Sequence, residues 1–144
     1  MIVVPFLPSH LEGFELQKEQ SLMHKYLMDE SYIDTIGLTG EAWTGLVDGN
    51  VKVIAGVFKA HEHIGVVWAL IGKDGNKYMP SITKNVLKWL DKNNTPRLET
   101  AVRRDFNEGH RWAKIMGFEN ETPEKGMKNY GSDGETYDLY ARFN

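Results

Sequence analysis

The sequence predicts one domain of the α/β (α+β) class, spanning residues 1–144 and built on a mixed, mostly antiparallel sheet. Three successive runs between Ala42 and Ile71 have the length and composition of β-strands, which favours an antiparallel meander. After Ile71, two segments with the period of amphipathic helices enclose another short strand. A strand that follows a helical crossover lies parallel to its predecessor, so one strand pair is expected to be parallel.

Composition excludes several classes of protein. The hydrophobic fraction of 41% and the charged fraction of 26% are those of an ordinary globular domain. The sequence has no apolar run of about 18 residues, so we expect no membrane span. Its first residues lack the basic start of a secretory signal. The absence of cysteine excludes disulfides and thiolate zinc sites, and it fits a cytoplasmic location.

The net charge of −3 is unevenly distributed. Between Lys73 and Lys114 there are ten Lys or Arg residues and five Asp or Glu residues, a surplus of five positive charges. A basic middle in an acidic chain favours a local anion site, whereas a domain that binds nucleic acid is usually basic as a whole. A solvated helix face is the alternative interpretation of the same charges.

The N-terminal part predicts an edge strand and helices. Met1–Val4 is a short apolar run followed by two prolines, a pattern typical of an edge strand. Ser9–Glu12 has the form of a capping box, with Ser9 at the N-cap, and Gly13 weakens the helix that it would begin. Further helical turns are expected between residues 22 and 38.

The meander strands are expected at Ala42–Val47, Val51–Lys59 and Ile64–Ile71. Asp48–Asn50 forms the first connection, because these residue types tolerate a positive φ. His61–His63 forms the second connection. Since Ile64–Ile71 is almost entirely apolar, we expect it to be a central strand covered on both faces.

The next element is expected to be a helix whose inward residues are Ile82, Val86, Leu87 and Leu90. A strand at Leu98–Val102 and a helix at Asn107–Met116 follow, the helix with Trp112, Ile115 and Met116 inward. The last strand is expected at Tyr137–Phe143. Pro80 suits the first turn of the first helix, which Asn93–Pro96 ends. Gly117 closes the second helix, and Gly131–Gly134 forms a turn before the last strand.

The loop Gly72–Met79 joins the predicted central strand to the helix that follows. Such a loop can hold an anion, because backbone N–H groups and the positive end of a helix converge there. Gly75 allows a sharp turn, and Lys73 or Lys77 could face a phosphate. The alternative is a charged connecting loop that binds no ligand.

Two segments resemble the GCN5-related N-acetyltransferase (GNAT) superfamily. Asn107–Phe118, which reads NEGHRWAKIMGF, resembles the family's Asn-led fourth helix that ends in Gly-Phe. Trp43–Gly49 followed by Val53–Val57 resembles its second and third strands. More narrowly, roughly 100 residues after Ala42 are similar to GNAT-like proteins of tailed phages, a group that includes an internal virion or assembly protein. The resemblance implies a sheet of about six to seven strands with helices on both faces.

The resemblance also implies an acetyl-CoA-dependent N-acyltransferase that acts on an amine of a small molecule or a protein. The family supplies part of its site from backbone amides of the fourth strand and from the loop after it. Carried over to this sequence, the cofactor-binding residues are Ala69, Leu70, Ile71, Gly72, Lys73, Gly75, Asn76, Lys77, Tyr78, Asn107 and Arg111.

The sequence departs from the family pattern in three places. The loop at Gly72–Met79 lacks the spacing of the family's Gln/Arg-x-x-Gly-x-Gly/Ala motif, although it contains glycines and lysines. The position of the family's proton-donating tyrosine is Ala113, and alanine cannot donate a proton. Asn107 also lies one residue closer to Gly-Phe than usual. The competing hypothesis is therefore a degenerate GNAT scaffold in virion assembly or host interaction, with a phage or host protein partner, located in the host cytoplasm or the virion.

Two titratable residues are candidates for catalysis. Glu99 could accept a proton through water, or it could be an outward-facing strand residue. His110 could be catalytic or could lie on a helix surface. His61 and His63 share a strand face, but no third ligand has a recognisable spacing, so we expect no metal site.

Overall fold

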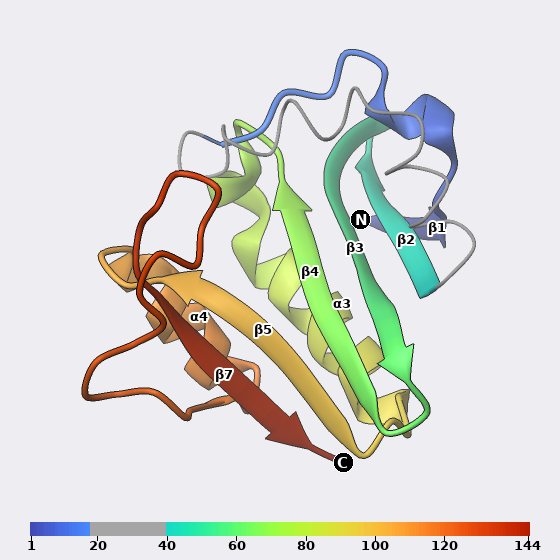
Figure 1. The fold of residues 1–144 in the computed structure, drawn as a ribbon. Coiled ribbons are helices and arrows are strands. Elements are labelled where there is room, and N and C mark those ends of the chain that lie inside the picture. Colours follow the sequence, from blue (N-terminus) through green and yellow to red (C-terminus); the bar gives the residue numbers. More distant parts are fainter. Residues whose placement is uncertain (18–39) are drawn as a thin grey trace.

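The computed structural model describes residues 1–17 and 40–144, and its sheet has seven strands. The strands are β1 (Ile2–Pro5), β2 (Gly40–Val47), β3 (Asn50–His61), β4 (Ile64–Ile71), β5 (Arg97–Arg103), β6 (Glu119–Asn120) and β7 (Tyr137–Phe143). Their order across the sheet is β1-β2-β3-β4-β5-β7-β6 (Figure 1). Only β4 and β5 are parallel, so the prediction of a mixed, mostly antiparallel sheet is confirmed.

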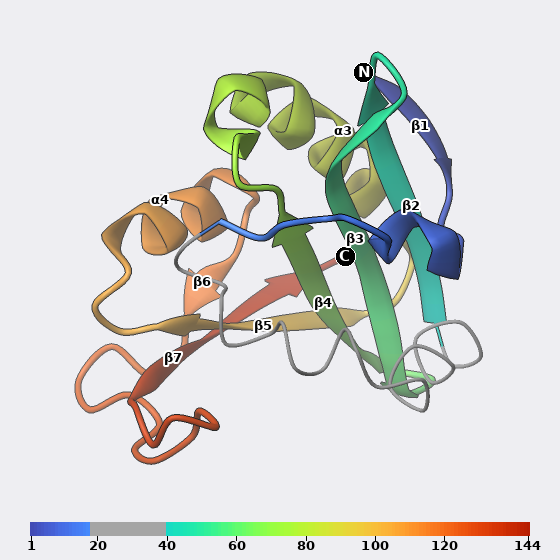
Figure 2. The same ribbon diagram turned by 90° about the horizontal axis from the view of Figure 1, so that it is seen from above.

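The described helices are two 3-10 helices, η1 (Pro8–Leu11) and η3 (Gly75–Tyr78), and two α-helices, α3 (Met79–Lys92) and α4 (Asn107–Ile115). Both α-helices cover the same face of the sheet (Figure 2). The helices expected between residues 22 and 38 lie outside the described residues. No helix in the described ranges is long and apolar enough to cross a membrane.

The core follows from the alternation of side chains along the strands. On β3, Val53 is fully buried against α3 and α4, while Ile54 is fully buried on the opposite face. Helix α3 contributes Ile82, Val86 and Leu90, three of the four residues of the predicted stripe. Burying each such side chain stabilises the fold by about 1.5–3 kcal/mol.

The second face is covered in part by the N-terminal segment. Phe14 packs there against Ile54 of β3 and Leu70 of β4. Leu11 and Leu16 extend this contact on either side. The segment therefore runs across the central strands (Figure 2), which brings residues near the start of the chain to the end of β4.

The hairpin between β2 and β3 lies where it was predicted, but its connection is Asp48 and Gly49 alone, because Asn50 already belongs to β3. Asp48 has φ 52° and Gly49 has φ 78°, so both residues of the connection lie in the left-handed region. The expected strand at Ile64–Ile71 and the expected strand at Tyr137–Phe143 have the observed bounds of β4 and β7.

Three local expectations are corrected by the structure. Ser9 is not an N-cap, because the short helix η1 already begins at Pro8 and spans four residues. Ile115 points outward with 61% of its surface exposed; Ala113 of α4 and Met116, which directly follows the helix, face the core about one helical turn apart. Strand β6 was not expected, since two residues carry no detectable periodicity.

Candidate functional site at the end of β4

Strands β4 and β5 remain together over only part of their length. Their pairing joins Ile64–Val66 to Arg97–Glu99, and among the described residues it goes no further. Beyond these three pairs the strands diverge, as Figure 1 shows. We call Val67–Ile71 and Thr100–Arg103 the β4–β5 splay. Along the splay, β5 does not pair with β4.

The chain leaves β4 through a tight connection into α3. A Cβ atom on Gly75 would lie 2.3 Å from Cγ2 of Ile71, so this position needs glycine for close packing. Its φ does not lie in the left-handed region, which differs from the sharp turn that the sequence suggested. Helix η3 runs directly into α3, and Asp74 stands at the start of this continuous helical stretch.

The charges of the loop are mostly paired within the chain. Lys52 Nζ lies 2.7 Å from Asp74 Oδ2, and Lys73 Nζ lies 3.5 Å from Glu15 Oε2. The hydrogen bond from Lys52 lowers the pKa of Asp74. Lys77 forms no ion pair with any described residue. It is therefore the cation of this loop that remains available for an external anion.

Four backbone amides of the loop also donate hydrogen bonds within the chain. Gly72 donates to Lys52 O at 2.9 Å, Lys73 to Glu15 O at 2.8 Å, Gly75 to Gly72 O at 2.8 Å and Lys77 to Asp74 O at 3.3 Å. In addition, the Asp74 carboxylate places a negative charge where the positive end of the helix would attract a phosphate. Part of the anion-binding capacity of the loop is therefore used within the chain.

The segment Glu15–Gln17 lies along the end of β4. Leu16 forms an antiparallel bridge with Gly72, and the amide of Gln17 donates to Ile71 O at 2.9 Å. Because the amide of Gly72 points to β3, the neighbouring Ile71 carbonyl points to the opposite edge, that of the splay. The N-terminal segment therefore covers part of the β4 edge that does not pair with β5.

A groove of about 680 Å³ opens beside this contact. It is bounded by η1, by the hairpin between β2 and β3, and by the loop after β4, with Lys52, Lys73 and Asp74 on its wall. The groove shows that the loop is accessible from the side opposite to α4.

His110 lies between α4 and the sheet, with its side chain 16% exposed, and not on the helix surface. Its Nε2 atom is 3.1 Å from Arg103 O and 2.9 Å from Arg104 O. Carbonyl oxygens only accept, so Nε2 carries a proton, and in the neutral ring Nδ1 then accepts from the Tyr140 hydroxyl at 2.7 Å. Both ring nitrogens are occupied, which makes His110 an anchor between α4, β5 and β7.

Tyr140 is a buried tyrosine in the cluster that contains Ala113, the position where the resemblance places a proton-donating tyrosine. Its side chain is 1% exposed and packs in the same cluster as Ala113, which is 5% exposed. Burial raises the pKa of the Tyr140 hydroxyl, and the nearby Asp138 carboxylate raises it further. A hydroxyl at this depth can support His110, but it cannot reach a reactant in solvent.

Helices α3 and α4 are joined across the sheet by side chains. Trp112 Nε1 donates to Thr83 Oγ1 at 2.9 Å, which fixes the middle of α4 against the first turns of α3. Asn107 begins α4, and Arg111 lies one turn later, paired with Glu108 at 3.8 Å on the exposed side. In the described ranges, no hydrogen bond or ion pair joins Asn107 or Arg111 to the loop after β4.

Glu99 is placed where the two strands part. It is the last β5 residue paired with β4, opposite Val66, and its side chain is 21% exposed. Arg97 Nε lies 3.6 Å from its carboxylate, while the same guanidinium binds Glu121 at 3.2 Å. Glu99 is thus at the point where the two strands part, and its carboxylate is paired with Arg97.

The structure brings together one part of the predicted set. Ala69–Ile71, Gly72, Lys73, Gly75, Asn76, Lys77 and Tyr78 are contiguous around the end of β4. Sequence reasoning missed Lys52, Asp74 and Glu15, which pair across distant parts of the chain and carry no local signal. It also missed Tyr140, which the alternation of β7 could have placed inward.

Comparison with known proteins shows the fold. No protein-family model matches the sequence, and no curated protein matches it. A probable acetyltransferase from Staphylococcus epidermidis superposes with a TM-score of 0.74 at 10% identity, covering 99% of this chain and 98% of that chain. The ribosomal-protein-S18-alanine N-acetyltransferase from Escherichia coli gives 0.72 at 12% identity, with coverages of 99% and 92%. The aminoglycoside 6'-acetyltransferase type Ii gives 0.69 at 11% identity, with coverages of 99% and 97%. The chain therefore has the fold of these acetyltransferases.

Proposed function

We propose that the protein belongs to the GNAT superfamily and is an acetyl-CoA-dependent N-acyltransferase. The observation that supports this most directly is the β4–β5 splay, where β5 separates from β4 beside a loop that carries Lys73 and Lys77. Solved structures with the same fold over the full length of the chain are acetyltransferases. The acceptor would be an amine of a protein or a small molecule, as the names of two structural neighbours state for those proteins.

The residues around the splay fit an anionic cofactor in part. Lys77 would bind a phosphate, since no described residue pairs with it, and Lys73 would do so after leaving Glu15 on the exposed surface. Acetyl-CoA would supply an activated acetyl thioester. Glu99, at the point where the two strands part, is the residue that could accept the proton of the attacking amine through water.

Calorimetric titration of the purified protein with acetyl-CoA and with CoA tests this function. We expect saturable binding of both, and Lys77→Glu should weaken it roughly tenfold, because a charge-assisted contact is lost and a repulsive one is added. The loss should be larger at low salt, where screening is weaker.

Lys88→Glu is the matched control for this substitution. It makes the same change of charge on an exposed position of α3 that lies 11 residues further along the chain. We expect its affinity to stay close to that of the wild type. No heat of binding at millimolar ligand would exclude the enzyme, and equal effects of the two variants would place the phosphates elsewhere.

A second function is favoured by a specific observation. Four amides of the loop are bonded within the chain, and Asp74 stands at the start of the helix with its negative charge, so fewer groups remain for an external anion. Together with Ala113, this supports a degenerate GNAT scaffold that binds a phage or host protein. Absence of binding to CoA and acetyl-CoA, combined with recovery of a virion or host protein in affinity purification from infected cells, would support it. Acetyl transfer to any amine would refute it.

A further inference from the structure

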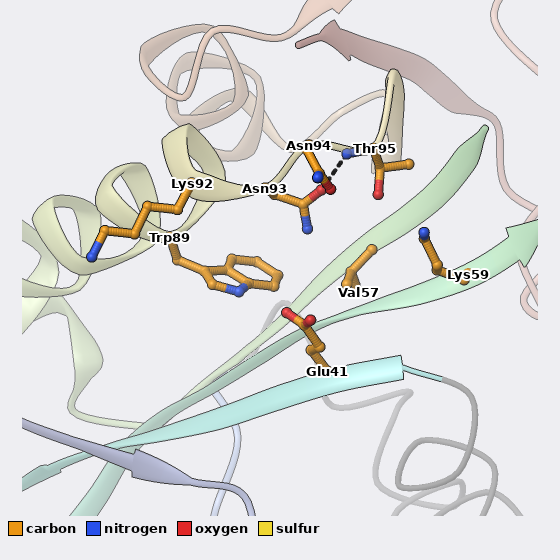
Figure 3. Close-up of a pocket in the computed structure, with 8 residues that line it drawn as sticks. All are labelled: Glu41, Val57, Lys59, Trp89, Lys92, Asn93, Asn94 and Thr95. Atoms are coloured by element: carbon orange, nitrogen blue, oxygen red, sulfur yellow. Dashed lines mark hydrogen bonds between the residues drawn. The ribbon is translucent and has the colours of Figure 1, made fainter. Parts of the chain in front are cut away.

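A separate pocket lies at the C-terminal end of α3, away from the loop after β4 (Figure 3). Because α3 has 14 residues, its two ends are roughly 20 Å apart. The pocket has a volume of about 230 Å³ and is formed by the start of β2, the end of β3 and the connection from α3 to β5. None of its residues belongs to the proposed cofactor site.

One wall of the pocket is aromatic and held in place. The indole of Trp89 packs edge-to-face on Trp43, with ring centroids 6.2 Å apart and planes at 77°. The floor is made by Val57 and Thr95, each 3% exposed. Trp43 Nε1 is itself buried and has no hydrogen-bond partner in the described ranges. Trp89 is therefore held by its contact with Trp43, and one buried polar atom behind it has no partner in the described ranges.

The rim carries charges of both signs. Glu41 stands opposite Val57 in the β2–β3 register, and Lys59 lies two residues along β3 on the same face. Figure 3 shows the Glu41 carboxylate directed towards Trp89 and the Lys59 side chain directed towards the connection after α3. Neither Glu41 nor Lys59 forms an ion pair with a described residue.

Asn93 adds a fixed hydrogen-bond donor. Its Oδ1 atom accepts from the amide of Thr95 at 2.9 Å, which assigns the orientation of the carboxamide and leaves its NH₂ group to donate (Figure 3). The Lys59 ammonium and this NH₂ group therefore suit an anion. On the other side, the Glu41 carboxylate, the Trp89 ring and the C-terminal end of α3 suit a cation.

We propose that this pocket binds a small zwitterion, namely a free α-amino acid. Its ammonium group would bind Glu41 over the face of Trp89, and its carboxylate would bind Lys59 and the Asn93 carboxamide. A volume of about 230 Å³ has room for an amino acid with a side chain of moderate size. The site is independent of the β4–β5 splay and of the proposed acetyl transfer.

Indole N–H resonances of ¹⁵N-labelled protein test this binding, because the four tryptophans give separate signals that Trp→Phe variants assign. Titration with alanine, leucine, lysine and glutamate should shift the Trp89 signal saturably for at least one of them. Trp112 is bonded to Thr83 near the other end of α3, so its signal should not move. Propylamine and propionate, which carry one charge each, should bind at least roughly tenfold more weakly than the amino acid.

Substitutions then locate the charges. Glu41→Gln and Lys59→Gln should each weaken binding roughly tenfold, whereas Glu62→Gln, an exposed acid in the turn between β3 and β4, should leave it unchanged. The undisturbed Trp112 signal reports that each variant is folded. No shift at Trp89 with any of the four amino acids at about 10 mM, equal binding of propylamine or propionate, or wild-type affinity in Glu41→Gln would overturn the proposal.

Discussion

Single residues buried between α4 and β7 show how polar groups fix the position of a helix. The Nε2 atom of His110 is bonded to the carbonyls of Arg103, the last residue of β5, and of Arg104, which follows it. Its Nδ1 atom is bonded to the hydroxyl of Tyr140. Every polar atom of this ring is bonded, which satisfies the requirement for burying it. The histidine that looked like a catalytic candidate is thus explained by packing, while Glu99 remains a prediction.

Tyr140→Phe should destabilise the protein by about 1–2 kcal/mol, because Nδ1 of His110 loses its donor inside the core. Urea denaturation at neutral pH measures this change. Tyr130→Phe is the control, since Tyr130 is 58% exposed, and its free energy of unfolding should stay within about 0.5 kcal/mol of the wild type.

The same variant makes a prediction for alkaline pH. Burial holds the pKa of Tyr140 above its ordinary value of about 10 in the folded state, so the unfolded chain releases this proton first as the pH rises. The stabilisation by Tyr140 is therefore fully present below pH 10 and declines above it. The difference between wild type and Tyr140→Phe should narrow in that range, and a constant difference would argue against a raised pKa.

Among the elements, the N-terminal segment and β4 are coupled through backbone hydrogen bonds. Segment Glu15–Gln17 covers the edge of β4 at the splay, and Phe14 anchors it to the sheet. A ligand that used this edge would have to displace the segment.

Gln17→Pro removes the amide that donates to Ile71 O, while Gln17→Ala keeps it. The amide of Lys73, which donates to Glu15 O, should then exchange with solvent about three- to tenfold faster in the proline variant only. Hydrogen exchange followed by NMR measures this rate. Equal rates in the two variants would show that the contact at Gln17 does not hold the segment. If CoA uses the β4 edge, its affinity should rise in Gln17→Pro.

At the scale of the whole molecule, β7 connects both α-helices to the sheet. Arg142 donates to Met116 O at the end of α4 at 3.0 Å and also binds Asp91 of α3. Its side chain is 14% exposed. One residue of the strand therefore holds the C-terminal ends of two helices.

Arg142→Met should lower the free energy of unfolding by about 1–2 kcal/mol, because the Met116 carbonyl loses a charged donor. Arg111→Met is matched in chemistry, but Arg111 and its partner Glu108 are each 70% exposed, so its effect should stay within about 0.5 kcal/mol. Thermal or urea denaturation compares the two. Equal effects would mean that Arg142 contributes no more than a surface ion pair.

Periodicity and turn chemistry were sufficient to predict most of the described fold. The run Ile64–Ile71 and the alternation of Tyr137–Phe143 determine two strands, and Asp48 and Gly49 determine a hairpin, all from local signals. The inward face of α4 was predicted wrongly at Ile115, because adjacent helix residues point about 100° apart and Ile115 falls outside the apolar stripe of Trp112, Ala113 and Met116.

The candidate site was less predictable because it depends on distant contacts. The pairs Lys52–Asp74 and Glu15–Lys73 join segments far apart in the sequence, and they decide whether the loop can accept an anion. The glycines of the loop were visible in the sequence, but the partners of its amides were not. The residue types of the loop thus indicate a candidate anion site, but they do not determine whether an anion binds there.

The limited pairing between β4 and β5 also has a mechanical consequence. We call strands β1–β4 and strands β5, β7 and β6 the two ribbons of the sheet. Three residue pairs join the two ribbons, whereas seven pairs join β5 to β7. The sheet is therefore easiest to deform at the short β4–β5 pairing near Ile64–Val66, which we call the seam. The hydrogen bond between Trp112 and Thr83 supports it on one side. Rotation of one ribbon against the other about this seam would change the width of the splay while the hydrogen bonds within each ribbon remain intact.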